Sequence, residues 1–162
     1  MWNSAVVAPS QRTFRQEFRE AFNARREGDV TALIGFVQRP SDSPEDSVRP
    51  FAARSLGKLK NPLAVDALLD ALDDPEFDVR AAAIGSLRRI GDKRAVQPLT
   101  DRVGLATSEA EFVILLNALR VLDAQPATAD ALRLADHPNP RVRRALARAT
   151  AVPRRKWFAL RR

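Results

Sequence analysis

The feature that most constrains the fold is a repeat with a period of 31 or 32 residues. Val48 and Val79 lie 31 residues apart, and Leu56, Leu87 and Leu119 recur at spacings of 31 and 32. A period in this range is typical of α-solenoids, whose units bury their apolar faces only by stacking on neighbouring units. The chain is therefore expected to be a stack of similar units rather than one globular core.

Each unit contains two segments whose apolar residues have helical spacing. In the unit at 75–104, Ala83, Leu87 and Ile90 belong to one apolar stripe, and Asp92 precedes a second. An Asp or Asn at this place accepts hydrogen bonds from the free N–H groups of the helix that follows. The sequence thus predicts an all-α fold, a right-handed α-α superhelix of about four helical hairpins.

The pattern divides the chain into a leader at 1–12, a repeat domain at 13–152 and a basic aromatic tail at 153–162. The step from Val30 to Val65 is 35 residues, which predicts a longer loop after the first repeat. The predicted repeats are 13–40, 44–73, 75–104 and 108–136, with a partial repeat at 139–152.

Two segments resemble HEAT repeats of the short type found in phycobilin lyase subunits. They are VRPFAARSLGKLKNPLAVDALLDALDDP and VRAAAIGSLRRIGDKRAVQPLTDRV. The shared pattern is a Val-Arg pair, small and large apolar positions, a Leu, an Asp or Asn turn, and then Ala-Val and Leu at helical spacing. The resemblance is close over 48–103, recognisable over 105–148 and weak over 13–40. Glu111 and Phe112 replace the Val-Arg pair in the fourth repeat. Such motifs specify a fold better than a function.

Two kinds of enzyme share this repeat, the phycobilin lyases and the iron-dependent deoxyhypusine hydroxylases. The resemblance to the hydroxylases implies iron held by His-Glu pairs on successive repeats, whereas this sequence has a single His, His137, and no such pair. The chain also has no Cys, so thiolate ligands and Cys nucleophiles are excluded. Asp73 and Asp74 fit helix caps better than a metal site. We therefore predict no catalytic residues, no metal, no cofactor and no enzymatic activity.

The net charge of +7 is concentrated at the C-terminus. Residues 1–137 carry 18 basic and 20 acidic side chains, whereas residues 138–162 carry nine basic and no acidic ones. An electrostatic partner is therefore expected first at the C-terminus.

The tail combines basic and aromatic side chains. This combination suits nucleic acid, an anionic membrane surface or an acidic protein. In the alternative interpretation the aromatic residues fold back and cap the last helix, as terminal repeats require. The tail residues predicted to bind a partner are Arg154, Arg155, Lys156, Trp157, Phe158, Arg161 and Arg162.

The second helices of the repeats line the concave side of the superhelix in the family that the sequence resembles. Their outward positions are mostly acidic, whereas those of the first helices are basic at Arg54, Lys58 and Arg120. This sorting of charge favours a groove for a peptide or protein, although a solvated surface gives the same pattern. The predicted concave binding residues are Asp66, Asp70, Gln97, Asp101 and Asp130.

One arginine recurs in the first helices, as Arg49, Arg80 and Arg143. We expect it to tie each repeat to the next through charge-assisted hydrogen bonds to acidic turns. Candidate acids in such turns are Asp78, Asp92 and Asp123.

No apolar run approaches the roughly 20 residues of a membrane helix, and the first residues lack a targeting pattern, so a cytoplasmic protein is expected. The function that we predict is a non-enzymatic scaffold that binds a protein partner through its concave helix faces. One alternative is a module that binds nucleic acid or an anionic surface through its basic C-terminus. The other, which rests on the resemblance alone, is an enzyme subunit of the lyase or hydroxylase type.

Overall fold

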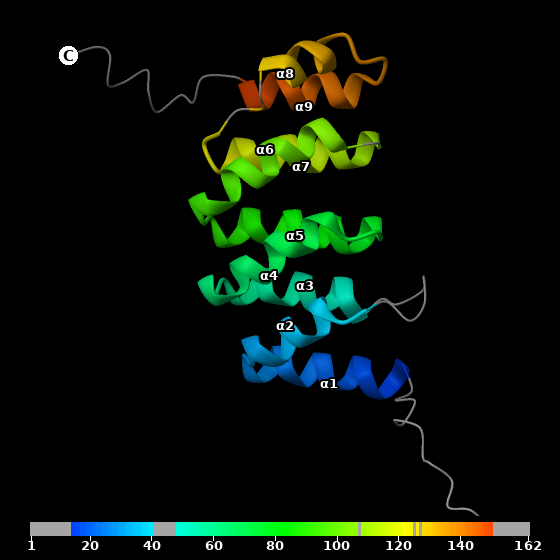
Figure 1. Ribbon diagram of the computed structural model, residues 1–162, viewed down its shortest axis with the longest axis vertical. Helices are drawn as coiled ribbons and strands as arrows, with labels where there is room; N and C mark the ends of the chain where they lie inside the picture. Colours follow the sequence, from blue (N-terminus) through cyan, green and yellow to red (C-terminus); the bar gives the residue numbers. More distant parts are fainter. Residues whose placement is uncertain (1–13, 41–47, 107, 125, 127, 151–162) are drawn as a thin grey trace, which may run out of the picture.

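The structure is a computed structural model that describes residues 14–40, 48–106, 108–124, 126 and 128–150. These residues form helices stacked in layers, with α1 at one end and α8 and α9 at the other (Figure 1). The α-helices are α1 (Phe14–Glu27), α2 (Val30–Gln38), α3 (Val48–Leu59), α4 (Val65–Asp70), α5 (Phe77–Ile90), α6 (Val96–Leu105), α7 (Glu109–Val121), α8 (Thr128–Ala135) and α9 (Pro140–Thr150). Short 3-10 helices flank α4 and precede α6: η1 (Pro62–Ala64), η2 (Ala71–Asp73) and η3 (Lys93–Ala95).

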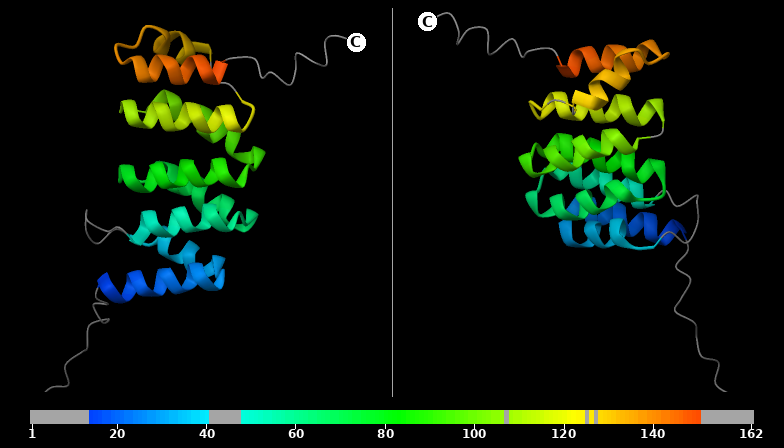
Figure 2. Two further views of the ribbon diagram at one scale, coloured as in Figure 1. Left: turned by 180° about the vertical axis from the view of Figure 1, so that it is seen from behind. Right: turned by 45° about the horizontal axis from the view of Figure 1, so that its top comes forward.

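Successive helices pair into repeats, and the predicted all-α superhelix is confirmed. The first to fourth repeats are α1 with α2, α3 with α4, α5 with α6, and α7 with α8, while α9 begins a fifth. Seen from behind, the first helices lie one above another in chain order (Figure 2). They are α1, α3, α5, α7 and α9. None of the described helices is long and apolar enough to cross a membrane.

Each repeat makes the same turn between its two helices. One residue per turn has a positive φ, and these residues follow one another at 32, 31 and 32 positions: Gly28, Lys60, Gly91 and Asp123. In the first three repeats the next side chain accepts a hydrogen bond of 2.9 Å from a backbone N–H at the start of the second helix: Asp29, Asn61 and Asp92. The left-handed residue ends one helix and the cap begins the next, so the hairpin angle is set locally.

The apolar stripes form one continuous core that runs the length of the stack, from Ala24 to Ala149. The three leucines of the sequence period, Leu56, Leu87 and Leu119, are fully buried. Because each stripe is covered by the adjacent layers, every repeat depends on its neighbours for burial.

The first helices of the second and third repeats, α3 and α5, approach each other closely at Gly57. A Cβ atom on Gly57 would lie 2.6 Å from the Cα atom of Ser86 and 2.4 Å from its Oγ. Ser86 Oγ in turn donates a 2.7 Å hydrogen bond to the carbonyl oxygen of Ala53 across the same contact. The two helix backbones can only reach this separation because position 57 has no side chain.

Gly57→Ala should therefore lower the free energy of unfolding by about 1 to 3 kcal/mol, because the added methyl group forces α3 and α5 apart. Urea denaturation followed by circular dichroism measures the change.

The matched control is Gly85→Ala on α5, where an added Cβ atom has no neighbour within 4 Å. This substitution should raise the free energy of unfolding by up to about 1 kcal/mol, since alanine has the higher helix propensity. Equal effects of the two substitutions would contradict the role assigned to the close approach.

Candidate partner-binding face

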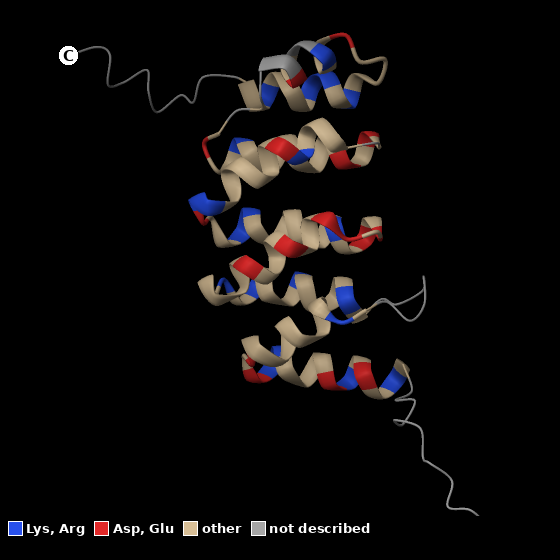
Figure 3. Cartoon of the chain, viewed as in Figure 1, with Lys and Arg blue, Asp and Glu red and all other residues tan. Residues whose placement is uncertain are grey.

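The second helices α2, α4, α6 and α8 form one side of the stack, here called the second-helix face. Acidic segments lie along α4 and α6 on the side turned toward the viewer in Figure 3. Four of the five predicted concave residues, Asp66, Asp70, Gln97 and Asp101, are exposed on these two helices, while Asp130 on α8 is half-buried.

Most of these polar side chains already have a partner within the chain. Asp66 accepts a 2.8 Å hydrogen bond from Arg94 of the next repeat. Gln97 Nε2 donates to Asp101 Oδ1 at 2.7 Å, and Asp130 lies 3.3 Å from the guanidinium of Arg133. The face is thus partly neutralised along its length.

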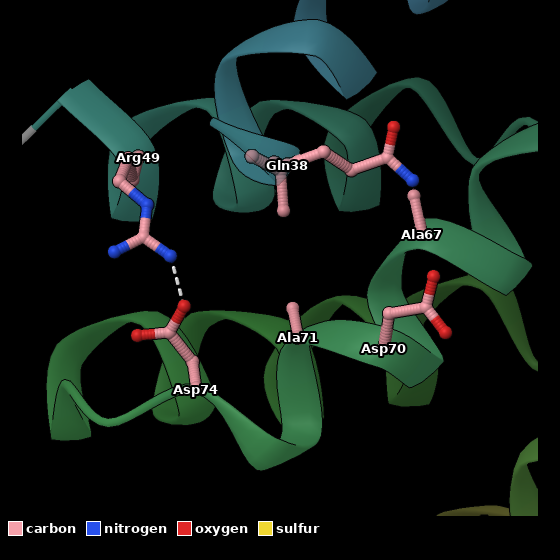
Figure 4. A pocket seen from close by; sticks show the side chains of 7 residues that line it. Gln38, Arg49, Ala67, Asp70, Ala71 and Asp74 are labelled. Carbon is pink, nitrogen blue, oxygen red and sulfur yellow. Dashed lines mark hydrogen bonds and ion pairs between the residues drawn. The ribbon is translucent and has the colours of Figure 1, made fainter. Parts of the chain in front are cut away.

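Asp70 differs from the other acids because it borders a pocket. The pocket has a volume of about 320 Å³ and lies between the end of α2, the start of α3 and the end of α4. Arg49 and Asp74 stand on one side of it, Asp70 on the opposite side, and Gln38 above (Figure 4). Among the described residues, the carboxylate of Asp70 has no hydrogen-bond or ion-pair partner, and it faces the pocket.

Arg49 is the least exposed of the charged residues that line this pocket, with only 5% of its surface exposed. One of its terminal nitrogens is hydrogen-bonded to Asp74, and the other lies 3.4 Å from Glu76 Oε1. Its Nε has no hydrogen-bond partner among the described residues. A buried guanidinium without counter-charges would be strongly destabilising, so Asp74 and Glu76 are required for this packing.

One repeat later, Glu111 is fully buried at the start of α7 and accepts hydrogen bonds from two arginines. Arg80 Nε approaches Glu111 Oε1 at 2.9 Å, and Arg102 Nη2 approaches the same oxygen at 3.1 Å. Burial raises the pKa of Glu111, but the hydrogen bonds and positive charges of Arg80 and Arg102 outweigh it and hold the pKa below its usual value. Arg102 also lies 3.3 Å from Asp73 of the preceding repeat.

The recurring arginine ties repeats together at two of its three positions, although to other acids than Asp78, Asp92 or Asp123. Arg49 and Arg80 reach the acids that begin the next repeat, whereas Arg143 donates to the carbonyl oxygens of His137 and Pro138 in the loop before its own helix. Glu111 could be singled out as the break in the Val-Arg pattern and Arg80 as the recurring arginine, but their pairing and the second partner, Arg102, had no signal in the sequence.

The predicted tail site, Arg154, Arg155, Lys156, Trp157, Phe158, Arg161 and Arg162, lies outside the described residues. Its assignment to nucleic acid or an anionic surface stays a prediction. His137 packs its ring against Phe112 at a centroid distance of 5.9 Å. Within the described part of the chain, no group of three or more His, Asp or Glu side chains is placed to hold a metal ion.

Comparison with known proteins links the chain to HEAT repeats and to bilin enzymes. A family model described as HEAT repeats matches residues 35–113. The bilin biosynthesis protein PecE of Nostoc sp. (strain PCC 7120) is 44% identical over 103 residues, which is 62% of this chain and 40% of the relative. The phycocyanobilin lyase subunit alpha of Picosynechococcus sp. (strain PCC 7002) is 31% identical over 142 residues, which is 79% of this chain and 53% of the relative. The chain thus spans about half the length, or less, of these relatives.

A solved structure has the same architecture. It is the complex of CpcE and CpcF of phycocyanin lyase from Nostoc sp. PCC7120, and the match has a TM-score of 0.67 and 27% sequence identity. It covers 92% of this chain and 68% of the solved chain.

These relatives correct the prediction that the chain has no enzymatic role. That prediction is wrong, because the relatives are subunits of enzymes, named as lyases of phycocyanobilin or phycocyanin. The prediction relied on finding catalytic side chains within one chain. A subunit of an enzyme can instead contribute binding and positioning to a site that a partner subunit completes.

The geometry around Glu111 predicts a specific dependence of stability on this carboxylate. Glu111→Gln should lower the free energy of unfolding by about 1 to 3 kcal/mol, because Arg80 and Arg102 lose the negative charge that they share. The folded-state pKa of Glu111 is depressed, so its contribution is complete above the ordinary pKa of the unfolded chain and is lost as the pH falls through the lower folded-state pKa. Urea denaturation at several pH values between about 3 and 7 measures both effects.

The control is Glu109→Gln, two residues away on the exposed side of α7, where the carboxylate meets Asn139. It should change the free energy of unfolding by less than about 1 kcal/mol and leave the pH dependence close to that of the original chain. If Glu111→Gln kept the full acid-induced loss of stability, the loss would have to come from other carboxylates.

Proposed function

We propose that this chain, which belongs to the HEAT-repeat family, is a subunit of a bilin-lyase-type enzyme and binds its partner protein through the second-helix face. In this proposal the chain does not act alone. It pairs with a second protein, and the pair binds a bilin, a linear tetrapyrrole, for attachment to or release from an acceptor protein.

The observation that carries the proposal is the match to the solved phycocyanin lyase complex, which extends over 92% of this chain. The relatives named for bilin biosynthesis and phycocyanobilin lyase support the same assignment, since they match most of the repeat region. The solved structure is a complex of two different proteins, which supports a protein partner for this chain as well.

The properties of the second-helix face support its role as the binding surface. Asp70 and Asp101 occupy equivalent exposed positions 31 residues apart, on α4 and α6. The first helices carry exposed basic residues instead, among them Arg54, Lys58 and Arg120. A partner with a basic surface would be attracted to the acidic face and repelled from the opposite one, which fixes the orientation of binding.

The test is affinity purification of the full chain from its native host, with bound proteins identified by mass spectrometry and bound bilin by visible absorbance. We expect one protein in stoichiometric amount and a complex that binds added phycocyanobilin. The double substitution Asp70→Lys with Asp101→Lys should lower the amount of bound partner at least about tenfold, because it reverses the charge at the centre of the face.

The matched control reverses charge on the other side with Arg54→Glu and Lys58→Glu, two exposed residues of α3, and should leave partner binding unchanged. The proposal fails if no stoichiometric partner is found, or if the purified pair does not bind the bilin.

A further inference from the structure

Ala71, which lines the pocket beside Asp70, has an equivalent position in each of the next two repeats, and comparison of the three positions shows what the pocket lacks. Ala71, Arg102 and Arg133 occupy the same place at the C-terminal part of their second helices, at steps of 31 residues. In the third and fourth repeats, therefore, a guanidinium stands where the second repeat has a methyl group.

Arg102 shows what this guanidinium does in the third repeat. It shares Glu111 with Arg80, the recurring arginine of the first helix, and its other end reaches Asp73 at the end of η2. Arg133 plays the corresponding part in the fourth repeat, where it donates to the carbonyl oxygen of Val103 at 3.0 Å and lies over the ring of Phe112. Both arginines bridge adjacent repeats, Arg102 through all three of its guanidinium nitrogens and Arg133 through Nη2.

The second repeat presents the same surroundings without that arginine. Arg49 corresponds to Arg80, and Asp74 pairs with Arg49 as Glu111 pairs with Arg80. Gln38, at the end of α2, precedes Asp73 by 35 residues, the same step that separates Val30 from Val65. With Ala71 in place of an arginine, these groups border the open pocket of about 320 Å³.

The charges around the two sites differ accordingly. In the third repeat, Arg80 and Arg102 balance Glu111 and Asp73. Among the described residues of the second repeat, Arg49 is the basic side chain paired with the carboxylates of Asp74 and Glu76, while Arg80 of the next repeat donates to the carbonyl oxygen of Asp74. The carboxylate of Asp70 borders the pocket as well. The pocket therefore has an excess of negative charge that one additional cation would reduce.

We propose that the pocket of the second repeat binds an arginine side chain from the partner protein, between the carboxylates of Asp70 and Asp74. A guanidinium fits better than an ammonium group because its planar fork can donate to both carboxylates and to the side-chain oxygen of Gln38, as Arg102 does toward Glu111 and Asp73. The presence of Arg49 is no obstacle, since Arg80 and Arg102 share one carboxylate in this same chain. The inference deepens the proposed function and rests on it for the source of the arginine.

The chemistry of the pocket can be tested without the partner. The probe is N-acetyl-arginine amide, titrated into the full ¹⁵N-labelled chain and followed by amide chemical shifts, with N-acetyl-citrulline amide as the uncharged probe of similar shape. We expect saturable shifts at Gln38, Ala71 and Asp74 with the arginine probe, and affinity lower by about tenfold or more with citrulline, since hydrogen bonds between charged groups are lost. Equal binding of the two probes, or no binding of either, would overturn the proposal.

Two substitutions locate the site. Ala71→Arg supplies the guanidinium from within the chain and should abolish probe binding, while Asp70→Asn should weaken it about tenfold. The control is Asp101→Asn, which removes the equivalent carboxylate one repeat later, beside the helix position already occupied by Arg102, and should leave probe binding unchanged. Should Ala71→Arg fail to fold, the contrast between Asp70→Asn and Asp101→Asn decides, and equal effects of these two would contradict the assignment.

Binding of the partner protein to the Ala71→Arg variant distinguishes a failure of this inference from a failure of the proposed function. Ala71→Arg should lower the affinity for the partner protein at least about tenfold, because a buried charged contact is lost. A chain that binds the arginine probe but has neither partner nor bilin would contradict the proposed function and leave the pocket chemistry intact. A partner that binds Ala71→Arg as well as the original chain would contradict the origin of the arginine proposed here.

Discussion

A buried arginine that must find its counter-charge in the next repeat is the interaction on which this solenoid most depends. Arg49 is 5% exposed, and in the described part of the chain its guanidinium is neutralised by Asp74 and Glu76, which begin the following repeat. Arg80 has the same relation to Glu111. Burying such a charge without its partner would lower the free energy of unfolding by several kcal/mol. The acidic side chains must therefore lie opposite the arginines when the layers stack. Apolar burial drives the stacking, and these pairs select one alignment of the layers.

The arginines of the second helices add a second contact to the same junctions. Arg102 binds Glu111 of the fourth repeat and Asp73 of the second, so three successive repeats are joined at its guanidinium. Arg133 crosses the next junction through the carbonyl oxygen of Val103, and within its own repeat its guanidinium lies over the ring of Phe112. The position is thus adaptable: an arginine can contact a carboxylate, a carbonyl group or an aromatic ring, and the buried Ala71 leaves a pocket of about 320 Å³.

Local and periodic features of this fold could be predicted from the sequence, whereas contacts that join three repeats could not. The period at Leu56 and Leu87 and the turns at Gly28 and Asp92 depend on residues close in sequence, so they fixed the helices and their pairing. The approach of Gly57 to Ser86 depends on how two helices pack, and the shared carboxylate of Glu111 depends on side chains nine and 31 residues away. Asp66 and Asp70 were predicted to belong to the same face, but only the structure separates the acid paired with Arg94 from the acid beside a pocket. The prediction of no enzymatic activity rested on the lack of a recognisable set of catalytic side chains in this sequence, and the lyase subunits among its relatives overturn it.

Because each repeat contacts only its neighbours, a junction can be altered for binding without disturbing the rest of the stack. Asp70 is exposed and Ala71 needs no unusual backbone, so an open junction in the second repeat causes little strain. The apolar core passes beneath it unchanged, through Leu56, Leu68 and Leu87, all fully buried. Stability and recognition therefore depend on different residues of the same repeat. Leucines and first-helix arginines hold the stack together. The residue at the end of the second helix decides whether the chain itself fills the junction or a side chain of another protein can enter it.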